Sequence, residues 1–141
     1  MLVHERDELD TSKSKTTGLI LAEIPGERPF STTDVFLHFG GGGEPNGFII
    51  GKLENRVINI GFPKGIGNTE NYVIKQYPED FSTGDLRWDY RPQAGETVIA
   101  DKGSIKLKVS HTNKSTEGTF EFSTKETPPR KITGEFNLKN P

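Results

Sequence analysis

The sequence contains no cysteine, which excludes disulfide bonds, thiol chemistry and zinc sites built on cysteine. It also lacks long apolar runs. The first run, residues 18–22, is far too short for the core of a signal peptide, and no segment approaches the roughly 20 apolar residues of a membrane-spanning helix. We therefore predict a cytoplasmic protein without a membrane span, while a secretion route that needs no signal peptide stays open.

The sequence also has a small net charge and few histidines. Eighteen basic residues balance twenty acidic ones to a net charge of −2, so no overall field draws the protein to a phosphate backbone, and we expect no nucleic-acid partner. The three histidines, His4, His38 and His111, are widely separated and lie in unlike contexts. A metal site made of all three is therefore not expected.

The 141 residues fit one domain that buries a core of its own. Sixteen glycines and nine prolines are scattered along the chain, which indicates many tight turns between short elements. Residues 1–16 are polar and follow neither the helical nor the strand period, so they are interpreted as a flexible polar arm. Residues 17–141 are interpreted as a single β domain.

Short runs of β-branched and aromatic residues, bounded by turn residues, predict successive strands. The clearest is Ser104 to Ser110, where apolar residues alternate with lysine, so that one face is buried and the other solvated. A two-residue gap, Glu54 and Asn55, predicts a hairpin. The strands expected are residues 18–23, 34–39, 47–53, 56–62, 71–77, 86–90, 97–101, 104–110, 118–123 and 131–138.

No fixed repeat and no sustained helical spacing is present. Strands of this number and spacing predict an all-β fold. We expect a single antiparallel β-sandwich, jelly-roll-like or immunoglobulin-like, of about 8 to 10 short strands. A closed β-barrel is the alternative.

The last third of the chain, in which EGTFEFS is followed by a proline-containing turn and then by ITGEFNL, resembles small bacterial all-β proteins of unknown function. The resemblance covers about a quarter of the chain and rests on strand chemistry that many β proteins share. It implies an all-β fold and carries no catalytic residues.

Motifs for nucleotide binding and for nucleophilic catalysis are missing. The tetraglycine Gly40 to Gly43 has neither the phosphate-loop nor the dinucleotide pattern, which favours a glycine-rich connection, and no GxSxG motif occurs. A glycoside hydrolase would need two paired carboxylates, and Glu117, Glu121, Glu135 and Asp89 are the residues that could face one groove. The alternative is that these are solvated strand positions.

Calcium is the one cofactor that the sequence allows, and no cofactor is the default prediction. Acidic residues cluster at Glu79, Asp80, Asp85 and Asp89, and Asp80 and Asp85 are the candidate ligands. Loop carboxylates suit the flexible oxygen shell of calcium, but the EF-hand pattern is absent. A solvated acidic loop is the competing interpretation.

The segment from Tyr77 to Arg91 concentrates the only tryptophan, two of the three tyrosines and two arginines. Such residues dominate recognition sites, because aromatic faces stack on sugar rings or anchor a protein partner. The candidate ligand-binding residues are Tyr77, Arg87, Trp88, Asp89 and Tyr90. The alternative is that Trp88 and Tyr90 fill the core while Arg87 and Asp89 point outward.

These features rank three functions. The first is a non-enzymatic binding module that recognises a glycan or a protein partner. The second is a small structural or interaction protein, such as an inhibitor or an assembly subunit, that pairs through its edge strands. The third is a carbohydrate-active hydrolase.

Overall fold

The computed structural model describes residues 15–39, 47–63, 66–82 and 85–141. The predicted all-β fold is confirmed: these residues form ten strands, all paired antiparallel. The strands are β1 (Thr17–Glu23), β2 (Phe30–Thr32), β3 (Val35–His38), β4 (Phe48–Leu53), β5 (Arg56–Gly61), β6 (Val73–Tyr77), β7 (Asp89–Arg91), β8 (Val98–Ser110), β9 (Ser115–Thr124) and β10 (Lys131–Lys139).

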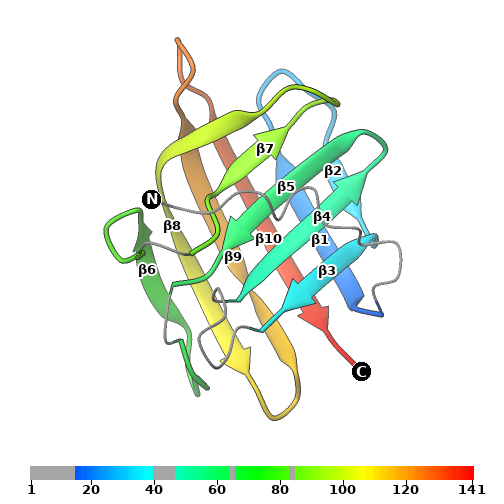
Figure 1. Ribbon diagram of the computed structural model, residues 1–141, viewed down its shortest axis with the longest axis vertical. Helices are drawn as coiled ribbons and strands as arrows, with labels where there is room; N and C mark the ends of the chain where they lie inside the picture. Colours follow the sequence, from blue (N-terminus) through cyan, green and yellow to red (C-terminus); the bar gives the residue numbers. More distant parts are fainter. Residues whose placement is uncertain (1–14, 40–46, 64–65, 83–84) are drawn as a thin grey trace.

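One continuous sheet wraps around the core. Its strand order is β2-β1-β10-β9-β8-β7-β5-β4-β3, and β6 pairs with β8 off this path. Figure 1 shows the consequence: β3, β4 and β5 cross in front of a second layer that contains β8, β9, β10 and β1. Of the two architectures expected from the sequence, the barrel alternative fits this sheet, which is nearly closed on itself.

The first corner of the barrel lies in β8. This strand of 13 residues pairs with β7 at Val98 and Ile99 and then with β9 from Ala100 to Ser110. The register shifts between Ala100 and Lys102, and such a bulge bends a strand and increases its twist. The prediction of two separate strands over this region was wrong, because the bulge interrupts the alternating pattern without ending the strand.

The second corner lies between β2 and β3. β2 pairs with β1 in one layer, and β3 pairs with β4 in the other, with only Thr33 and Asp34 between them. Thr32 Oγ1 accepts from the Asp34 N–H at 3.0 Å, and the Asp34 carbonyl accepts from the Lys52 N–H at 2.9 Å. This corner was not predicted, because β2 has only three residues and so short a strand leaves no periodic signal in the sequence.

Side chains protect the backbone of edge strand β3. Thr16 Oγ1 accepts from the Leu37 N–H at 3.1 Å, and Asn140 Nδ2 donates to the Leu37 carbonyl at 2.9 Å. An unprotected edge offers free backbone groups to the strands of other chains. Residues from just outside β1 and β10 thus occupy these two groups, at the place where the two ends of the sheet approach each other.

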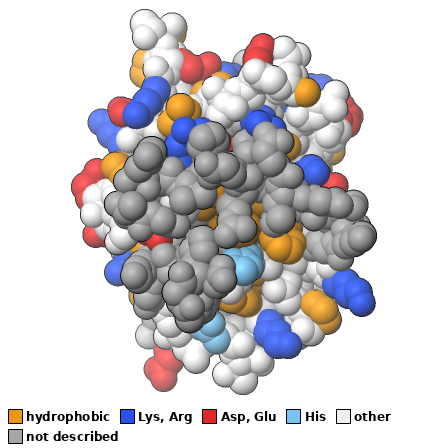
Figure 2. All heavy atoms as spheres, viewed as in Figure 1, with side chains coloured by type: hydrophobic (Ala, Val, Ile, Leu, Met, Phe, Trp, Pro, Cys, Tyr) orange, Lys and Arg blue, Asp and Glu red, His pale blue; other side chains and the backbone are white. Residues whose placement is uncertain are grey.

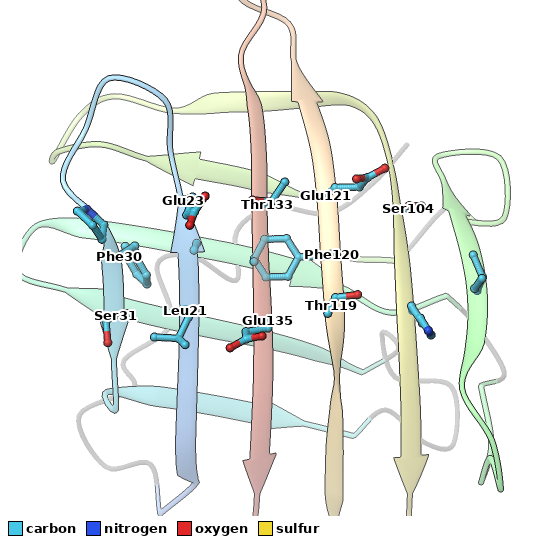
Figure 3. A pocket seen from close by; sticks show the side chains of 15 residues that line it. Leu21, Glu23, Phe30, Ser31, Ser104, Thr119, Phe120, Glu121, Thr133 and Glu135 are labelled. Atoms are coloured by element: carbon cyan, nitrogen blue, oxygen red, sulfur yellow. The ribbon is translucent and has the colours of Figure 1, made fainter.

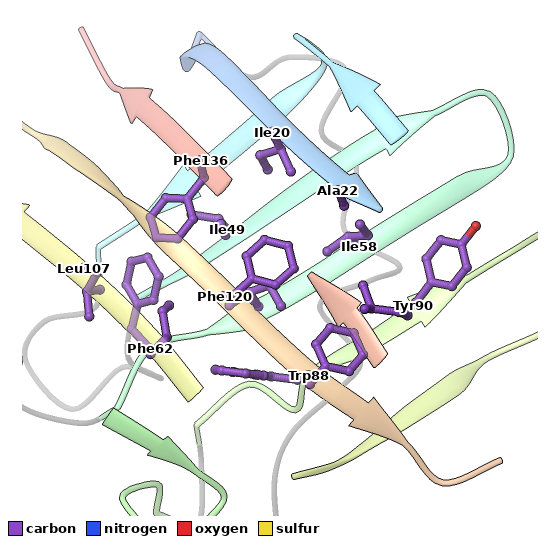
Figure 4. Close-up of a cluster of buried hydrophobic side chains, with 14 of the residues drawn as sticks. Ile20, Ala22, Ile49, Ile58, Phe62, Trp88, Tyr90, Leu107, Phe120 and Phe136 are labelled. Carbon is purple, nitrogen blue, oxygen red and sulfur yellow. The ribbon is translucent and has the colours of Figure 1, made fainter. Parts of the chain in front are cut away.

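Large apolar side chains fill the interior (Figure 4). They come from alternate positions of both layers, as half-buried strands require. On the neighbouring strands β9 and β10, glycines stand opposite phenylalanines: Gly118 pairs with Phe136, and Gly134 pairs with Phe120. The fully buried core includes Ile20, Ile49, Ile58, Ile60, Phe62, Trp88, Tyr90, Leu107, Ile132 and Leu138.

A second, smaller cluster lies on the opposite face of β4 and β5. Phe48, Ile50 and Val57 alternate with the core residues of these strands and pack with Leu86. The ring of His38 stacks on Phe48 at 4.9 Å between centroids. Figure 2 looks onto this side of the molecule, and histidine and hydrophobic side chains are visible there. In the part of the chain that is described, no helix has the length and apolar character of a membrane span.

Candidate functional site

The predicted aromatic site lies in the core. Trp88 is 0% exposed, stacks on Tyr77 at 4.5 Å, and donates from Nε1 to the Gly61 carbonyl at 2.8 Å. Tyr90 is also fully buried. Stacking on a sugar requires an exposed ring face, and these three rings have none. The competing interpretation of the sequence, that Trp88 and Tyr90 fill the core, is the one that the structure bears out.

Arg87 and Asp89 point to the other face, as strand alternation predicts, but Asp89 is buried there as well. Asn59 Nδ2 donates to Asp89 Oδ1 at 2.7 Å, and Arg87 Nη2 lies 3.3 Å from Asp89 Oδ2. A buried carboxylate needs such partners to offset its desolvation. The interactions of Asp89 therefore belong to the packing of β5 against β7, and the expectation that it is solvated was wrong.

The candidate calcium ligands each hold a turn. Asp80 Oδ2 accepts from the Gln76 N–H at 2.7 Å, and Asp85 Oδ2 accepts from the Ser82 N–H at 2.7 Å. Within the described ranges, no three or more His, Cys, Asp or Glu side chains gather into a possible metal site. Among these residues, Asp80 and Asp85 act as turn-stabilising acceptors.

A polar cluster links the β1–β2 and β9–β10 connections to β5 and β7, and we call it the arginine cluster: Glu27, Arg56, Tyr90, Glu126 and Arg130. Arg130 Nη1 donates to Glu27 Oε2 at 2.9 Å, and its Nε donates to Glu126 Oε1 at 2.8 Å. Arg56 Nε donates to the Tyr90 hydroxyl at 2.9 Å, and that hydroxyl donates in turn to Glu27. Both carboxylates are thus occupied by internal partners, which makes the cluster structural.

The same contacts set the pKa of each carboxyl group. Burial alone would raise the pKa of Glu27, but hydrogen bonds from Tyr90 and Arg130 and the charges of Arg130 and Arg56 outweigh it, so this pKa is lowered. Hydrogen bonds from Arg130 lower the pKa of Glu126 against a smaller effect of burial. A carboxyl group whose pKa is lowered by folding stabilises the folded state at pH values above its pKa in the unfolded chain, which is about 4.3. This stabilisation is lost as the pH falls through the pKa that the group has in the folded protein.

We therefore expect the free energy of unfolding to be steady from about pH 7 to pH 5 and to fall below about pH 4.5. Glu27→Gln should be less stable than the wild type at neutral pH, because it removes the charge that Arg130 and Arg56 face. The difference should shrink as pH falls, since the wild-type carboxylate is then protonated. Urea unfolding followed at several pH values measures both effects.

Glu70→Gln is the matched control, because Glu70 is exposed and no cation of the described residues lies within ion-pair distance of it. Its stability should follow that of the wild type at every pH. A Glu27→Gln variant that loses the same stability at pH 3 as at pH 7 would show that the charge of Glu27 contributes nothing.

The outer face of the other layer is hollowed and open. Side chains of β2, β1, β10, β9, β8 and β6 line a hollow of about 780 Å³, which we call the outer groove. Figure 3 looks into it and shows Leu21, Glu23, Thr119, Glu121 and Glu135 pointing out of the sheet. A second hollow, of about 440 Å³, continues along the same strands and shares four lining residues with the first.

Strand register arranges the groove in rows. In the middle row, Glu135 pairs with Thr119 and Leu21, Thr119 pairs with Lys106, and Lys106 pairs with Ile74. Directly paired side chains stand about 4.5 to 5.5 Å apart at Cβ on the same face. The rows on either side, read from β1 to β8, are Glu23–Thr133–Glu121–Ser104 and Leu19–Asn137–Glu117–Lys108.

The floor of the groove is polar, and each of its two rims carries exposed apolar side chains. β9 and β10 contribute glutamate, threonine and asparagine, and β8 contributes lysine and serine. Leu19 on β1 is 37% exposed, Ile74 on β6 is 63% exposed, and Tyr72 beside β6 is 42% exposed; these are the exposed large hydrophobic side chains of the described residues. Apolar groups that face water on both sides of a polar floor suit a ligand with both kinds of surface.

Sequence reasoning anticipated part of this groove. Glu117, Glu121 and Glu135 do face one groove, whereas Asp89 lies on the other layer. The signal was the alternation of polar residues in β8, β9 and β10, which is also the pattern of any solvated face. The sequence did not show that β6 and β1 border this face, because each pairs with a strand far away in the chain.

Of the histidines that the structure describes, neither His38 nor His111 lines the outer groove. His111 Nε2 lies 3.2 Å from the Ile66 carbonyl, and His38 stacks on Phe48. His4, most of the predicted arm and the tetraglycine Gly40 to Gly43 lie outside the described residues.

Comparisons of this chain with protein families, with curated proteins and with solved structures give no match. The resemblance of its last third to small bacterial all-β proteins therefore stays a prediction from the sequence. The candidate site rests on geometry alone.

Proposed function

We propose that this protein is a non-enzymatic binding module that holds an extended glycan in the outer groove. The observation that carries the proposal is the polar floor between two rims that carry exposed apolar side chains. A sugar presents hydroxyl groups around its edge and C–H groups on its faces. The floor offers acceptors and donors to the hydroxyls, and the rims offer apolar contact to the C–H faces.

The spacing of the rows supports a chain-like ligand. Neighbouring strands lie about 4.8 Å apart, which is close to the length of one sugar unit in a linear glycan. A glycan that crosses the strands along the middle row would meet Glu135, Thr119 and Lys106 in turn. Each sugar unit would then face one polar side chain. Strands that are far apart in the sequence would together bind one glycan chain.

The composition of the floor favours a glycan over a protein. Protein interfaces are enriched in tyrosine, tryptophan, phenylalanine, methionine and arginine, and depleted in lysine, glutamate and serine. The side chains that project from the floor are of the depleted types together with threonine and asparagine, whereas Phe120 and Phe136, which also line the groove, are buried beneath it. Its side chains suit a ligand that is itself rich in hydroxyl groups.

Two features favour binding over hydrolysis. A glycoside hydrolase keeps one carboxylic acid protonated by placing it in a desolvated, apolar site. Glu121 instead has a side chain that is 48% exposed and lies 3.3 Å from the ammonium group of Lys131. Glu135 is exposed and pairs across the sheet with Leu21 and Thr119 rather than with a second carboxylate.

A screen of the purified protein against soluble polysaccharides, by electrophoresis in gels that contain each polysaccharide, tests the proposal. We expect retardation by at least one of them. Glu135→Gln should weaken binding to it by about tenfold or more, because a hydrogen bond to a charged group contributes roughly 1.5 to 3 kcal/mol. Titration calorimetry with oligosaccharides measures the change.

Glu96→Gln is the control, since Glu96 is exposed in the turn between β7 and β8 and does not line the groove. It should bind like the wild type. Failure of every polysaccharide to retard the protein, or equal binding by the Glu135 and Glu96 variants, would remove the outer groove as a glycan site.

A further inference from the structure

Two lysines stand next to each other on the outward face of β8. Lys106 lines the outer groove, and Lys108 lies beside it, opposite the groove residue Glu117, whereas the acidic side chains of the groove stand on β1, β9 and β10. The groove thus has a basic side near β6 and an acidic side near β1. A ligand that crosses the strands meets both sides.

The two lysines converge on the exposed ring of Tyr72. Lys106 Nζ lies 5.3 Å from the ring centroid, and Lys108 Nζ lies 4.9 Å from it. Among the described residues, no carboxylate oxygen lies within ion-pair distance of either ammonium group. Two like charges therefore share one aromatic ring at the surface, although Glu117 stands opposite Lys108 on the next strand.

This arrangement suits an incoming anion. A cation–π contact at an exposed site is weaker than a charge-assisted hydrogen bond to a carboxylate. Both ammonium groups therefore gain interaction energy when they leave the ring and bind a carboxylate. Their movement exposes the Tyr72 ring, which can then contact the C–H face of a sugar. The same three side chains can hold the charged group and the ring of one sugar unit.

We propose that Tyr72, Lys106 and Lys108 form a subsite for a uronic acid within an otherwise neutral glycan. The proposal rests on the glycan-binding function proposed above. The acidic side of the groove limits how much charge the ligand can carry. A polymer with an anionic group on every unit would meet Glu117 and Glu135, for which the described residues provide no ion-pair partner, as well as Glu121, which Lys131 pairs with. A glycan with sparse uronic acids places its charge on β8 and its neutral hydroxyls over β9 and β10.

Matched polysaccharides test the subsite. The uronic-acid-bearing polysaccharide that binds best, for example a glucuronate-substituted xylan, is compared with its carboxyl-reduced form, in which every uronic acid has become a neutral sugar. We expect the acidic form to bind at least tenfold more tightly at low salt, and the advantage to shrink as salt rises. The Lys106→Gln/Lys108→Gln double variant should lose this advantage and keep the wild-type affinity for the reduced form.

Lys52→Gln/Lys125→Gln is the matched control, since neither lysine lines the groove and the change in charge is the same. It should keep the preference for the acidic form. Equal binding of the acidic and reduced forms by the wild type, or equal losses in the two double variants, would overturn the subsite and leave the binding function standing. Failure of both forms and of all neutral polysaccharides to bind would overturn the function as well.

Discussion

Replacing Trp88 with alanine should lower the free energy of unfolding by about 3 to 5 kcal/mol. The indole is fully buried, and its removal leaves a cavity against Tyr77, Phe81 and Phe122, which all contact it. The change also leaves the Gly61 carbonyl without its donor. For a domain of this size, the loss would be a large part of the total stability. Urea unfolding, followed by circular dichroism, measures it.

Tyr72→Ala is the control for this result. It removes another aromatic ring, but one that is half exposed at the surface, so stability should change by about 0.5 kcal/mol or less. If Trp88→Ala proved as mild as Tyr72→Ala, the indole would not be part of the core, and the aromatic site expected from the sequence would return as a candidate.

Gly118→Ala should have an effect of similar size, about 3 kcal/mol or more, from the addition of one methyl group. A Cβ atom at this position would lie 2.0 Å from the Lys106 carbonyl oxygen and 2.8 Å from the Leu107 Cα atom. Both are backbone atoms of β8, so the clash is relieved only if β8 and β9 move apart. Such movement would disturb the pairing at the centre of the layer that carries the outer groove.

Gly67→Ala provides the comparison, because a Cβ atom there would meet nothing within 4 Å. It should be neutral or slightly stabilising, since alanine restricts the unfolded chain more than glycine does. The same denaturation experiment serves for both variants. Equal stabilities of Gly118→Ala and Gly67→Ala would mean that β8 and β9 do not approach as closely as described.

Strands with clear alternation were predictable, and the hairpin of β4 and β5 across Glu54 and Asn55 is confirmed, whereas pairings between distant strands were not predictable. The pattern around Phe120 and Phe122 specified β9, and that around Phe136 and Leu138 specified β10, because one buried face fixes the period. The choice between sandwich and barrel depends on the corners at residues 33–34 and 100–102, which involve too few residues to produce a periodic signal. Pairings between distant residues, such as Leu21 with Glu135, leave no trace in a single sequence.

The candidate site was predictable to a smaller degree. Trp88 and Tyr77 have the chemistry of a recognition site and of a core alike, and burial, which decides between them, is a property of the whole fold. Glu121 and Thr133 carry no distinctive motif, and they become part of a groove only because β1 and β6 flank the sheet that holds them. A binding surface assembled from ordinary strand positions is therefore visible only after the strand order is known.

The pairing of β1 with β10 bears on how the chain folds as it is made. Thr17 lies opposite Lys139, and Glu23 lies opposite Thr133, so β1 meets this partner only after almost all the residues between them have left the ribosome. Hairpins such as β4–β5 and β9–β10 can form earlier during synthesis, since their two strands are close in sequence. We therefore expect β1 to be the last strand to gain its full set of hydrogen bonds, and the nascent chain to keep an open sheet edge until then.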